Sequence, residues 1–442
     1  MNTARFLPPI LSRHPFGLRV AEILAAAIHA VEPAAALRRF VRREGHFLWA
    51  ARNRYDLDAF RRLYLLAVGK AAAPMSAALI DLLGDRLEGG LLIPKQPYPA
   101  PGGGFTVQAG NHPIPGADSL QAGQAALALA ESLGAGDLLI CLISGGGSAL
   151  MSAPLPGLSL ADMQALTAEL LACGARIDEI NTLRRHLDRV KGGNLARAAA
   201  PAQVLSLILS DVVGSPLEAI ASGPTAPDLS TRADALGVLA RYGLESRLPS
   251  AVLDALRRSP ETPKPGDPRF EDVQNVLIGD NALALDDALG QAAALCFHTQ
   301  NLGSRWQGEA RAVAEALCEK LLTTNLPRPF CLAAGGETTV TLRGTGLGGR
   351  NQELALAAVE RLAGRPDVML ITLATDGEDG PTDAAGAVVT GETQAQAAAQ
   401  GFSPADFLAR NDAFRFFEPL GALLRTGPTG TNVNDITFLF GF

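Results

Sequence analysis

Two basic side chains stand where short apolar runs give way to helical segments. Lys70 follows the apolar run Leu63–Val68 and opens a segment of small residues, and Arg350 opens a strongly helical segment. A cation at the start of a helix lies against the positive end of the helix dipole, which is unfavourable unless an anion binds nearby. Although a lysine in a loop often only reaches solvent, both positions are candidates for contacting a phosphate or a carboxylate.

A glycine-rich turn follows a second apolar run. Ser144, Gly145, Gly146, Gly147 and Ser148 come directly after Leu138–Ile143. Consecutive glycines let the backbone approach a ligand closely and turn amide groups toward an anion. The turn is not a Walker A loop, because the chain has no GxxxxGK[ST]. By itself it indicates either a phosphate cradle or an ordinary tight turn.

Carboxylates follow two further apolar runs. Asp211 comes two residues after the run Val204–Leu209, and Asp376 comes two residues after Val368–Ala374. Mg²⁺ prefers hard oxygen ligands, so both are candidate magnesium ligands. His186 lies in a basic stretch of the kind that usually forms a solvated helix face, and we expect it to be a structural histidine.

A dinucleotide fingerprint offers a competing interpretation. Gly344, Gly346 and Gly349 satisfy GxGxxG between an expected strand and an expected helix, which favours a dehydrogenase. The acid at the end of the next strand, Asp376, comes later than the ~20-residue offset of a ribose-binding acid. Arg350 at the helix start also suits bidentate contact with a phosphate or carboxylate.

Composition excludes several classes of protein. The chain of 442 residues carries 38 Lys and Arg against 45 Asp and Glu, a net charge of −7, which argues against a nucleic-acid-binding surface. Its five cysteines are scattered without metal-binding spacing, so we expect reduced, mostly buried thiols. The N-terminus has no secretory pattern, and glycines and prolines interrupt the longest uncharged stretch, 138–161. We therefore expect a cytoplasmic protein with small-molecule substrates and neither nucleic acid nor membrane as partner; homo-oligomer formation is left open.

Alternating apolar runs and helical segments predict an α/β fold with a mainly parallel, Rossmann-like sheet and a second, mixed-sheet domain. We expect a helix over Leu18–Leu37 and a domain boundary in the proline-rich stretch Ser259–Asp267, giving domains 1–258 and 268–442 with the active-site cleft between them. The second block is predicted to contain strands at Val273–Ile278, Phe330–Ala334, Thr338–Leu342, Val368–Ala374 and Ile436–Phe440.

Taken in order, the motifs resemble the glycerate 2-kinase family, whose C-terminal part is the MOFRL domain and whose members are often labelled hydroxypyruvate reductase. The resemblance covers nearly the whole chain. Its specific parts are AVGKAA at 67–72, GNHPIPG at 110–116, SGGGSAL at 144–150, RRHLDRVKGGNLA from 184, SDVVG from 210, IASGPT at 220–225, GGRNQE at 348–353, ATDGEDGPTDAAGA from 374 and GPTGTNVND at 427–435. Many relatives carry an acid where this chain has Ser215, so no second carboxylate is expected there.

The resemblance implies two α/β domains and phosphorylation of the 2-hydroxyl of D-glycerate with ATP and Mg²⁺ as co-substrate and cofactor. It places Lys70 and Arg350 in catalysis, with Asp211 as a further catalytic residue or metal ligand and Asp376 as a second metal ligand. The alternative is an NAD(P)H-dependent hydroxypyruvate reductase. The remaining site residues predicted within the motifs bind nucleotide or phosphate (Ser144, Gly145, Gly146, Gly147, Ser148, Lys191, Thr429, Asn432) or substrate (Asn111, His112, Arg184).

Overall fold

The computed structural model describes residues 2–442. Contacts between residues divide the chain into two compact units, Ala36–Ile278 and Met1–Ala35 together with Gly279–Phe442. We call the first the Lys70 unit and the second the Arg350 unit. This division differs at both ends from the expected 1–258 and 268–442, because the first 35 residues belong with the C-terminal part and the boundary falls after residue 278.

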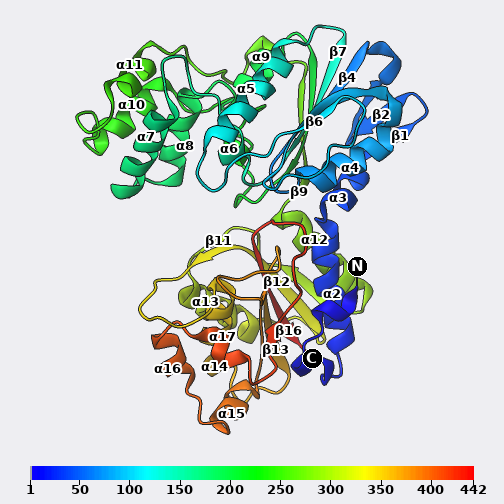
Figure 1. The fold of residues 1–442 in the computed structure, drawn as a ribbon. Coiled ribbons are helices and arrows are strands. Elements are labelled where there is room, and N and C mark those ends of the chain that lie inside the picture. The colour runs from blue at the N-terminus through cyan, green and yellow to red at the C-terminus, as the bar shows by residue number, and fades with distance from the viewer. Residues whose placement is uncertain (1) are drawn as a thin grey trace. The chain divides into compact units, whose positions relative to one another are not determined.

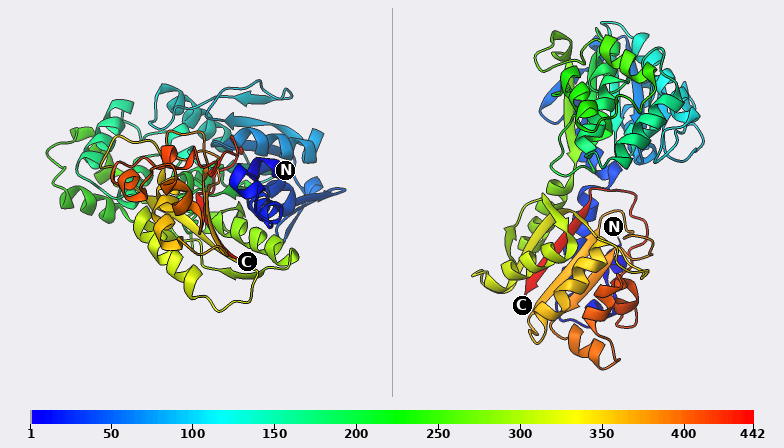
Figure 2. Two further views of the ribbon diagram at one scale, coloured as in Figure 1. Left: turned by 90° about the horizontal axis from the view of Figure 1, so that it is seen from below. Right: turned by 90° about the vertical axis from the view of Figure 1, so that its left-hand side faces the viewer.

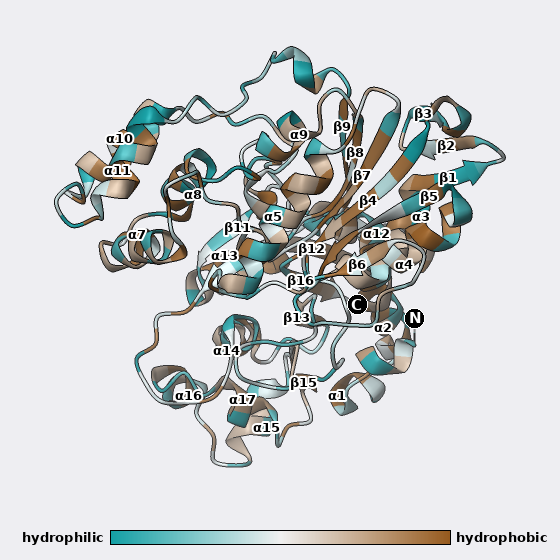
Figure 3. Cartoon of the chain, turned by 45° about the horizontal axis from the view of Figure 1, so that its top comes forward, coloured by the Kyte–Doolittle hydropathy of each residue, from teal (hydrophilic) through white to brown (hydrophobic). Residues whose placement is uncertain are grey.

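The Lys70 unit contains a six-stranded sheet with the order β6-β5-β4-β7-β8-β9. Figure 1 labels β4, β6, β7 and β9 of this sheet. The pairs of β4 with β5 and β7, of β5 with β6 and of β7 with β8 are parallel, which confirms the predicted parallel sheet. Every residue of β7 is buried, as expected for a strand covered on both faces, and the central strands are strongly hydrophobic (Figure 3). The strands are β4 (Arg62–Val68), β5 (Leu87–Ile93), β6 (Phe105–Val107), β7 (Asp137–Ile143), β8 (Gln203–Leu209) and β9 (Val273–Gly279).

The strand order reverses between β4 and β7. From β4 the chain adds β5 and β6 on one side and then returns to add β7, β8 and β9 on the other. In open α/β sheets ligands bind beyond the carboxyl ends of strands at such a switch point. Lys70 and the turn starting at Ser144 follow these two strands directly.

Helices of the Lys70 unit form two groups. Around the sheet lie α4 (Ala72–Leu83), α5 (Ala117–Glu131), α6 (Gly147–Leu150) and α9 (Asn194–Ala199). Beside it, α7 (Leu160–Ala172), α8 (Ile177–His186), α10 (Arg232–Arg241) and α11 (Ser250–Arg258) pack around their own apolar cluster, which includes Leu166, Ile180 and Leu239 (Figure 1). The unit also contains an antiparallel three-stranded sheet, β1 (Val41–Glu44), β2 (Phe47–Ala50) and β3 (Asn53–Asp56).

The Arg350 unit contains a mixed sheet with the order β10-β12-β16-β13-β14-β15, and β11 also pairs with β12. The last strand, β16, runs antiparallel between β12 and β13, and the red β16 is visible beside the orange β13 (Figure 2). Its first residue, Asp435, therefore lies opposite Gly336 and Ala374. The strands are β10 (His298–Asn301), β11 (Trp306–Glu309), β12 (Phe330–Thr339), β13 (Val368–Ala374), β14 (Gly386–Thr390), β15 (Leu423–Leu424) and β16 (Asp435–Gly441).

Eight α-helices accompany this sheet within the described residues of the Arg350 unit. Helix α2 packs against α12, and α13 packs against α14. Phe330, Leu439 and Val359 contribute to the buried apolar cluster. The helices are α1 (Pro9–Ser12), α2 (Gly17–Ala30), α12 (Asn281–Ala294), α13 (Ala310–Thr323), α14 (Arg350–Leu362), α15 (Thr393–Ala398), α16 (Pro404–Ala409) and α17 (Ala413–Phe417).

Three sequence predictions are wrong in detail. The helix expected over Leu18–Leu37 is two helices, α2 and α3 (Pro33–Phe40), because a proline in a helix interior removes a hydrogen bond and clashes with the preceding turn. The strand predicted at Val273–Ile278 is β9, the edge strand next to β8 in the first sheet. Thr338–Leu342 is not a separate strand, since β12 ends at Thr339 and Leu342 is exposed.

All five thiols are free, and Cys141, Cys318 and Cys331 are buried, in agreement with the expectation. No single helix among residues 2–442 is both long and apolar enough to cross a bilayer; α2 and α3 meet that criterion only as a bent pair.

Candidate functional site

The carboxyl ends of β4 and β7 are joined by short backbone contacts. The amide of Lys70 donates a hydrogen bond to the carbonyl of Gly145 (2.9 Å), and the Ser144 hydroxyl accepts one from the Ala71 amide (3.0 Å). Gly69 has φ +123°, and a Cβ there would lie 2.2 Å from Ser144 Oγ. Only glycine fits this approach, so the predicted lysine and the glycine-rich turn form one edge of the sheet.

Three polar side chains gather over Gly145 and Gly146. A Cβ added to Gly145 would lie 1.9 Å from Asp211 Oδ2, and one added to Gly146 would lie 3.3 Å from His112 Nε2 and 3.5 Å from Lys70 Cγ. The two glycines thus form a floor, and the carboxylate, imidazole and lysine stand around it. The structure brings these predicted residues together from four separate stretches of sequence.

The same surroundings shift two pKa values. Burial raises the pKa of the Asp211 carboxyl, while the positive charge of Lys70 opposes that shift. Burial, together with the charges of Lys70 and Lys95, lowers the pKa of His112, so its imidazole is uncharged at neutral pH. A neutral imidazole keeps one ring nitrogen able to accept a proton.

A loop with unusual backbone geometry contacts this edge. Ser215, Ala221 and Ser222 all have φ between 50° and 60°, a left-handed conformation that non-glycine residues rarely adopt. The Ser222 hydroxyl lies 2.7 Å from the Ser148 hydroxyl. Such conformations persist only where the surroundings hold them, and they concentrate at functional sites.

A small cavity next to the turn gathers residues that were predicted for different ligands. Ser148, Arg184 and Lys191 all line it. Lys191 is buried, with Nζ 2.6 Å from Asp188 Oδ2 and 2.9 Å from the carbonyl oxygen of Met151. Lys191 was predicted to bind nucleotide, but its ammonium group is already paired with Asp188.

Asn111 is tied into the start of α5. Its side-chain Oδ1 accepts a hydrogen bond from the Asp118 amide (3.1 Å), and its Nδ2 donates to the Asp118 carboxylate (2.9 Å). These contacts fix the loop that carries His112. The predicted substrate contact of Asn111 stays a prediction.

In the Arg350 unit, the predicted arginine is held between two carboxylates. Arg350 Nε lies 2.5 Å from Asp435 Oδ2, and Nη1 lies 2.9 Å from Glu337 Oε1. Glu337 belongs to β12 and Asp435 begins β16, so the antiparallel pairing of these two strands places both acids at the start of α14. Burial raises the pKa of Asp435, whereas Arg350 opposes that shift.

A further buried carboxylate, Asp379, occupies the N-terminus of α14. Its two oxygens accept hydrogen bonds from the backbone amides of Asn351 (3.1 Å) and Gln352 (2.8 Å). Burial nevertheless raises the pKa of Asp379 to about 6. The first amide donors of this helix are therefore satisfied by the protein itself.

This arrangement explains the GxGxxG motif without a dinucleotide. A Cβ on Gly344 would lie 2.6 Å from the backbone of Arg410. A Cβ on Gly346 would lie 2.5 Å from the Arg410 carbonyl oxygen and 2.6 Å from that of Asn411. A Cβ on Gly349 would lie 2.3 Å from the Asp379 carboxylate. The three glycines are needed for packing against neighbouring segments, and Asp379 stands where a pyrophosphate would have to bind.

The two polar loops of the Arg350 unit lie together. The Thr429 amide donates to the carbonyl of Asp376 (3.1 Å), and the Thr429 hydroxyl donates to the carbonyl of Thr375 (2.6 Å). Asn432 Oδ1 accepts a hydrogen bond from the Asn434 amide (3.0 Å). Asp376 and Arg350 line one cavity of about 600 Å³.

The donor set suits Mg²⁺ only in a site that is completed by substrate and water. No group of three or more His, Cys, Asp or Glu side chains within residues 2–442 is arranged to hold a metal ion. Magnesium usually takes one or two protein carboxylates and completes its shell with water and substrate phosphates. The Asp211 carboxylate, which lies over Gly145, fits such a site.

Sequence reasoning gave no individual role to three acids around Arg350: Glu337, Asp379 and Asp435. Asp379 and Asp435 lie within quoted motifs, so the signal was present. Asp435 reaches Arg350 only through the pairing of distant strands, and Asp379 reaches the start of α14 from the loop after β13. Asp188, which lies between Arg184 and Lys191 in the sequence, is also part of a quoted motif and was given no individual role.

Comparison with known proteins places this geometry in a family. A model described as a domain of unknown function, DUF4147, matches residues 19–257, and the MOFRL family model matches residues 330–435. Among curated proteins, the D-glycerate 2-kinase of Thermotoga maritima is 39% identical over 94% of this chain and 96% of its own length. The human glycerate kinase is 41% identical over 95% of this chain and 92% of its own length.

A solved structure agrees with these relatives. The crystal structure of a glycerate kinase from Thermotoga maritima is 38% identical, covers 97% of this chain and 100% of the solved one, and superposes with a TM-score of 0.87. A protein of Agrobacterium vitis named putative hydroxypyruvate reductase is 38% identical over 85% of this chain and 86% of its own length. The fold and the two polar edges are those of a two-domain α/β enzyme. The chain belongs to the glycerate kinase family.

Proposed function

We propose that this protein transfers the γ-phosphoryl group of ATP to the 2-hydroxyl of D-glycerate. The observation that carries the proposal is the near full-length similarity to the D-glycerate 2-kinase of Thermotoga maritima, at 39% identity. The residues that surround Gly145 and Arg350 agree with it, because phosphoryl transfer needs positioning and charge neutralisation.

In this reaction the 2-hydroxyl oxygen of glycerate forms a bond to the γ-phosphorus, the bond between that phosphorus and the β,γ-bridging oxygen breaks, and ADP leaves. The hydroxyl proton passes to a base or to solvent. Negative charge accumulates on the transferring group and on the leaving oxygen, so fixed cations and amide donors lower the barrier.

Lys70 and Arg350 are proposed as the cations that neutralise this charge. The Lys70 side chain has no hydrogen bond or ion pair to another described residue, so its ammonium group is available to a ligand. Asp435 (2.5 Å) orients the guanidinium of Arg350 through its Nε. Once Glu337 is displaced from Nη1, the remaining N–H groups of the guanidinium can bind an anion.

Asp211 is proposed to hold Mg²⁺ or to orient the attacking hydroxyl. Bound Mg²⁺ would neutralise negative charge on the nucleotide phosphates. A carboxylate with a raised pKa also accepts a hydroxyl proton more readily than an ordinary one. His112, with its lowered pKa, stands beside it as the predicted substrate contact.

The amides of the turn at 144–147 are proposed to contact nucleotide phosphates, as expected for consecutive glycines at a strand end. Thr429 and Asn432 remain candidates for the nucleotide, and Asp376 for the metal. The Thr429 hydroxyl already connects the two polar loops of the Arg350 unit, and the Asn432 side chain accepts a hydrogen bond within its own loop.

Reduction of hydroxypyruvate with NAD(P)H is the less favoured candidate. Its sequence argument was GxGxxG, and those glycines pack against Arg410 and Asp379. Because the relative from Agrobacterium vitis is named putative hydroxypyruvate reductase, this activity is assayed directly as well.

The assay uses purified protein with ATP, Mg²⁺ and D-glycerate, with L-glycerate as the matched control, and follows ADP release. A parallel reaction holds hydroxypyruvate and NADH. We expect ADP release that depends on D-glycerate and no NADH oxidation. NADH oxidation without ADP release would overturn the proposal.

A further inference from the structure

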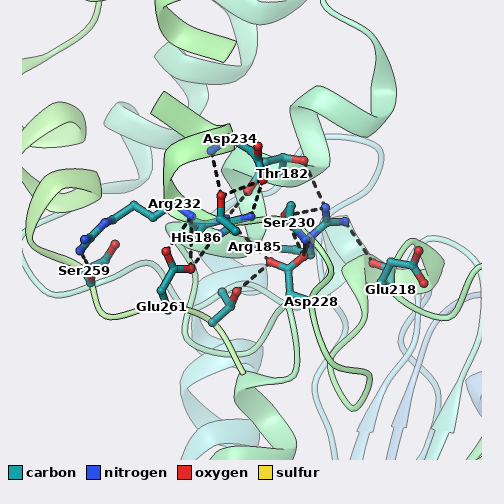
Figure 4. Close-up of polar contacts among 12 residues, drawn as sticks. Thr182, Arg185, His186, Glu218, Asp228, Ser230, Arg232, Asp234, Ser259 and Glu261 are labelled. Carbon is teal, nitrogen blue, oxygen red and sulfur yellow. Dashed lines mark hydrogen bonds and ion pairs between the residues drawn. The ribbon is translucent and has the colours of Figure 1, made fainter. Parts of the chain in front are cut away.

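Two adjacent arginines at the end of α8 have opposite surroundings. Arg185 is buried, and its guanidinium contacts Asp228 (2.8 Å), Ser230 (3.1 Å) and Thr182 (3.2 Å), as Figure 4 shows. These contacts connect α8 to the segment that leads into α10. Arg185 therefore has a structural role.

Arg184, one residue earlier, has no such partners. No hydrogen bond or ion pair within 4.0 Å joins its guanidinium to any other residue of 2–442, although Asp188 attracts it at longer range. The side chain is half-buried, and burial lowers the pKa of the guanidinium. Because an arginine keeps its charge in proteins, a half-buried guanidinium without partners is well suited to binding an anion.

The cavity that Arg184 lines is small and carries one net positive charge. Arg184, Lys191 and Asp188 are the charged residues among those that line it. Asp188 is fully engaged, because its carboxylate contacts the Ser152 hydroxyl (2.6 Å), the Val190 amide (2.9 Å) and Lys191. Lys191 uses two of its three donors on Asp188 and a carbonyl oxygen. Burial lowers the pKa of Lys191, and the Asp188 carboxylate opposes that shift. Arg184 and Lys191 are therefore the two basic groups that face the cavity, and the one carboxylate is already bound.

The size and walls of the cavity limit its ligand. Its free volume is about 20 Å³, and one water molecule requires about 10–15 Å³ on the same measure. The cavity therefore excludes a triphosphate and takes at most a small terminal group of a ligand. Ile114, Pro115, Leu160 and Met163 form the apolar part of the wall, which strengthens a charged contact by excluding water.

We infer that this cavity binds the carboxylate of the acceptor substrate, with Arg184 as its bidentate partner and Lys191, held by Asp188, as the second cation. The inference rests on the proposed function and gives the acceptor class as short carboxylic acids. Ser148 lines the same cavity and directly follows the glycine-rich turn. A carboxylate held at Arg184 therefore lies next to that turn, and Ser148 and Lys191 then serve the acceptor and not the nucleotide.

The test compares Arg184→Gln with the parent enzyme for each substrate separately. Because the substitution removes one partner of a desolvated charge pair, we expect KM for D-glycerate to rise about 100-fold or more. KM for ATP should change less than about twofold. Slow turnover of glycerol, which lacks the carboxylate, should be unaffected by the substitution.

Two further variants separate binding from folding. Arg184→Lys keeps the charge without the planar fork, so its KM for D-glycerate should lie between those of the parent and Arg184→Gln. Arg185→Lys removes contacts of the structural arginine, so it should lower the melting temperature and leave KM for D-glycerate near the parental value. If Arg184→Gln does not fold, Arg184→Lys carries the test.

Three results would overturn the inference: a rise in KM for ATP instead of D-glycerate, an equal loss with glycerol, or unchanged KM values in both Arg184 variants. Calorimetric titration with D-glycerate alone separates this inference from the proposed function. If the parent binds D-glycerate and Arg184→Gln does not, the carboxylate site stands even where ATP turnover is absent. If turnover is present and Arg184 has no effect, the inference fails alone.

Discussion

Lys70 and Arg350 both lie near the start of a helix at the edge of a sheet, but their surroundings differ. Lys70 stands at a parallel sheet beside a floor of glycines, and its side chain has no hydrogen bond or ion pair within the described residues. Arg350 stands at a mixed sheet, where Asp435 and Glu337 both lie within 3 Å of its guanidinium. Within the described residues Lys70 is exposed and unpaired, whereas the guanidinium of Arg350 is fixed in orientation and its charge is compensated by two carboxylates.

The difference follows from what each sheet brings to the edge. The parallel sheet supplies strand ends and turns, so the Lys70 edge is built from backbone groups and one carboxylate, Asp211. In the mixed sheet, antiparallel β16 delivers its first residue, Asp435, to the edge where β12 and β13 end. We therefore expect Lys70 to act as a freely oriented charge and Arg350 to act through a fixed geometry.

The largest effect should come from removing either cation. Lys70→Ala and Arg350→Ala should each lower kcat by about 10³-fold, because each removes charge stabilisation of the transferring phosphoryl group. Steady-state kinetics with saturating D-glycerate measures this. Lys320→Ala, a change in the last turn of α13, is the control and should leave kcat unchanged. Near-parental turnover in either active-site variant would end the two-cation scheme.

The glycine floor gives the next largest effect. In Gly145→Ala the new Cβ would lie 1.9 Å from Asp211 Oδ2 and must displace that carboxylate, so we expect kcat to fall about 10²-fold. Gly237→Ala in α10 is the matched control, since its Cβ meets nothing within 4 Å. It should leave kcat unchanged and raise stability by about 0.5–1 kcal/mol. Equal activity of the two variants would contradict the role given to Asp211.

A smaller effect tests how Arg350 is oriented. Asp435→Asn keeps the size of the side chain but removes the charge that holds Arg350 Nε at 2.5 Å. We expect kcat to fall about tenfold through misplacement of the guanidinium. Asp383→Asn, which removes an exposed partner of Arg425, is the control. Unchanged kcat in Asp435→Asn would mean that Glu337 alone positions Arg350.

The last effect is on stability rather than on turnover and concerns Asp379. Its pKa is raised from 3.8 to about 6 in the folded protein, so the folded state binds a proton that the unfolded state has released. Stability is therefore highest below pH 4 for this group and falls by about 3 kcal/mol as the pH rises through 6. Urea unfolding between pH 4 and 7 should show this loss in the parent but not in Asp379→Asn.

Asp367→Asn, at an exposed carboxylate, is the control for that titration and should keep the parental pH dependence. A parental curve in Asp379→Asn as well would place the pH dependence on another group. In that case the buried carboxylate at the start of α14 would not titrate near pH 6.

The sequence predicted those parts of the fold that depend on local pattern. Continuous apolar runs such as 138–143 identified the buried parallel strands, and consecutive glycines identified the turn at their ends. The break between α2 and α3 was also readable, because Pro33 lies inside the predicted helix. The unit to which β9 belongs could not be predicted, because an apolar run does not specify which strand it pairs with in a sheet.

The site was predictable to a similar extent. Strand-end position pointed to Lys70, Asp211 and Arg350, whereas the acids that compensate Arg350 arrive through long-range strand pairing. Arg184 and Arg185 are identical and adjacent in sequence, and only the structure distinguishes the unpaired guanidinium from the one tied to Asp228.

The position of the phosphate in the product distinguishes phosphorylation of the 2-hydroxyl of D-glycerate from phosphorylation of the 3-hydroxyl. D-Glycerate, ATP and Mg²⁺ are incubated with the protein, and enolase is added without a phosphoglycerate mutase. The account predicts immediate consumption of the product by enolase, because 2-phosphoglycerate is its substrate. ADP release with a product that enolase does not use would place the phosphate on the 3-hydroxyl, and no ADP release would contradict the kinase assignment altogether.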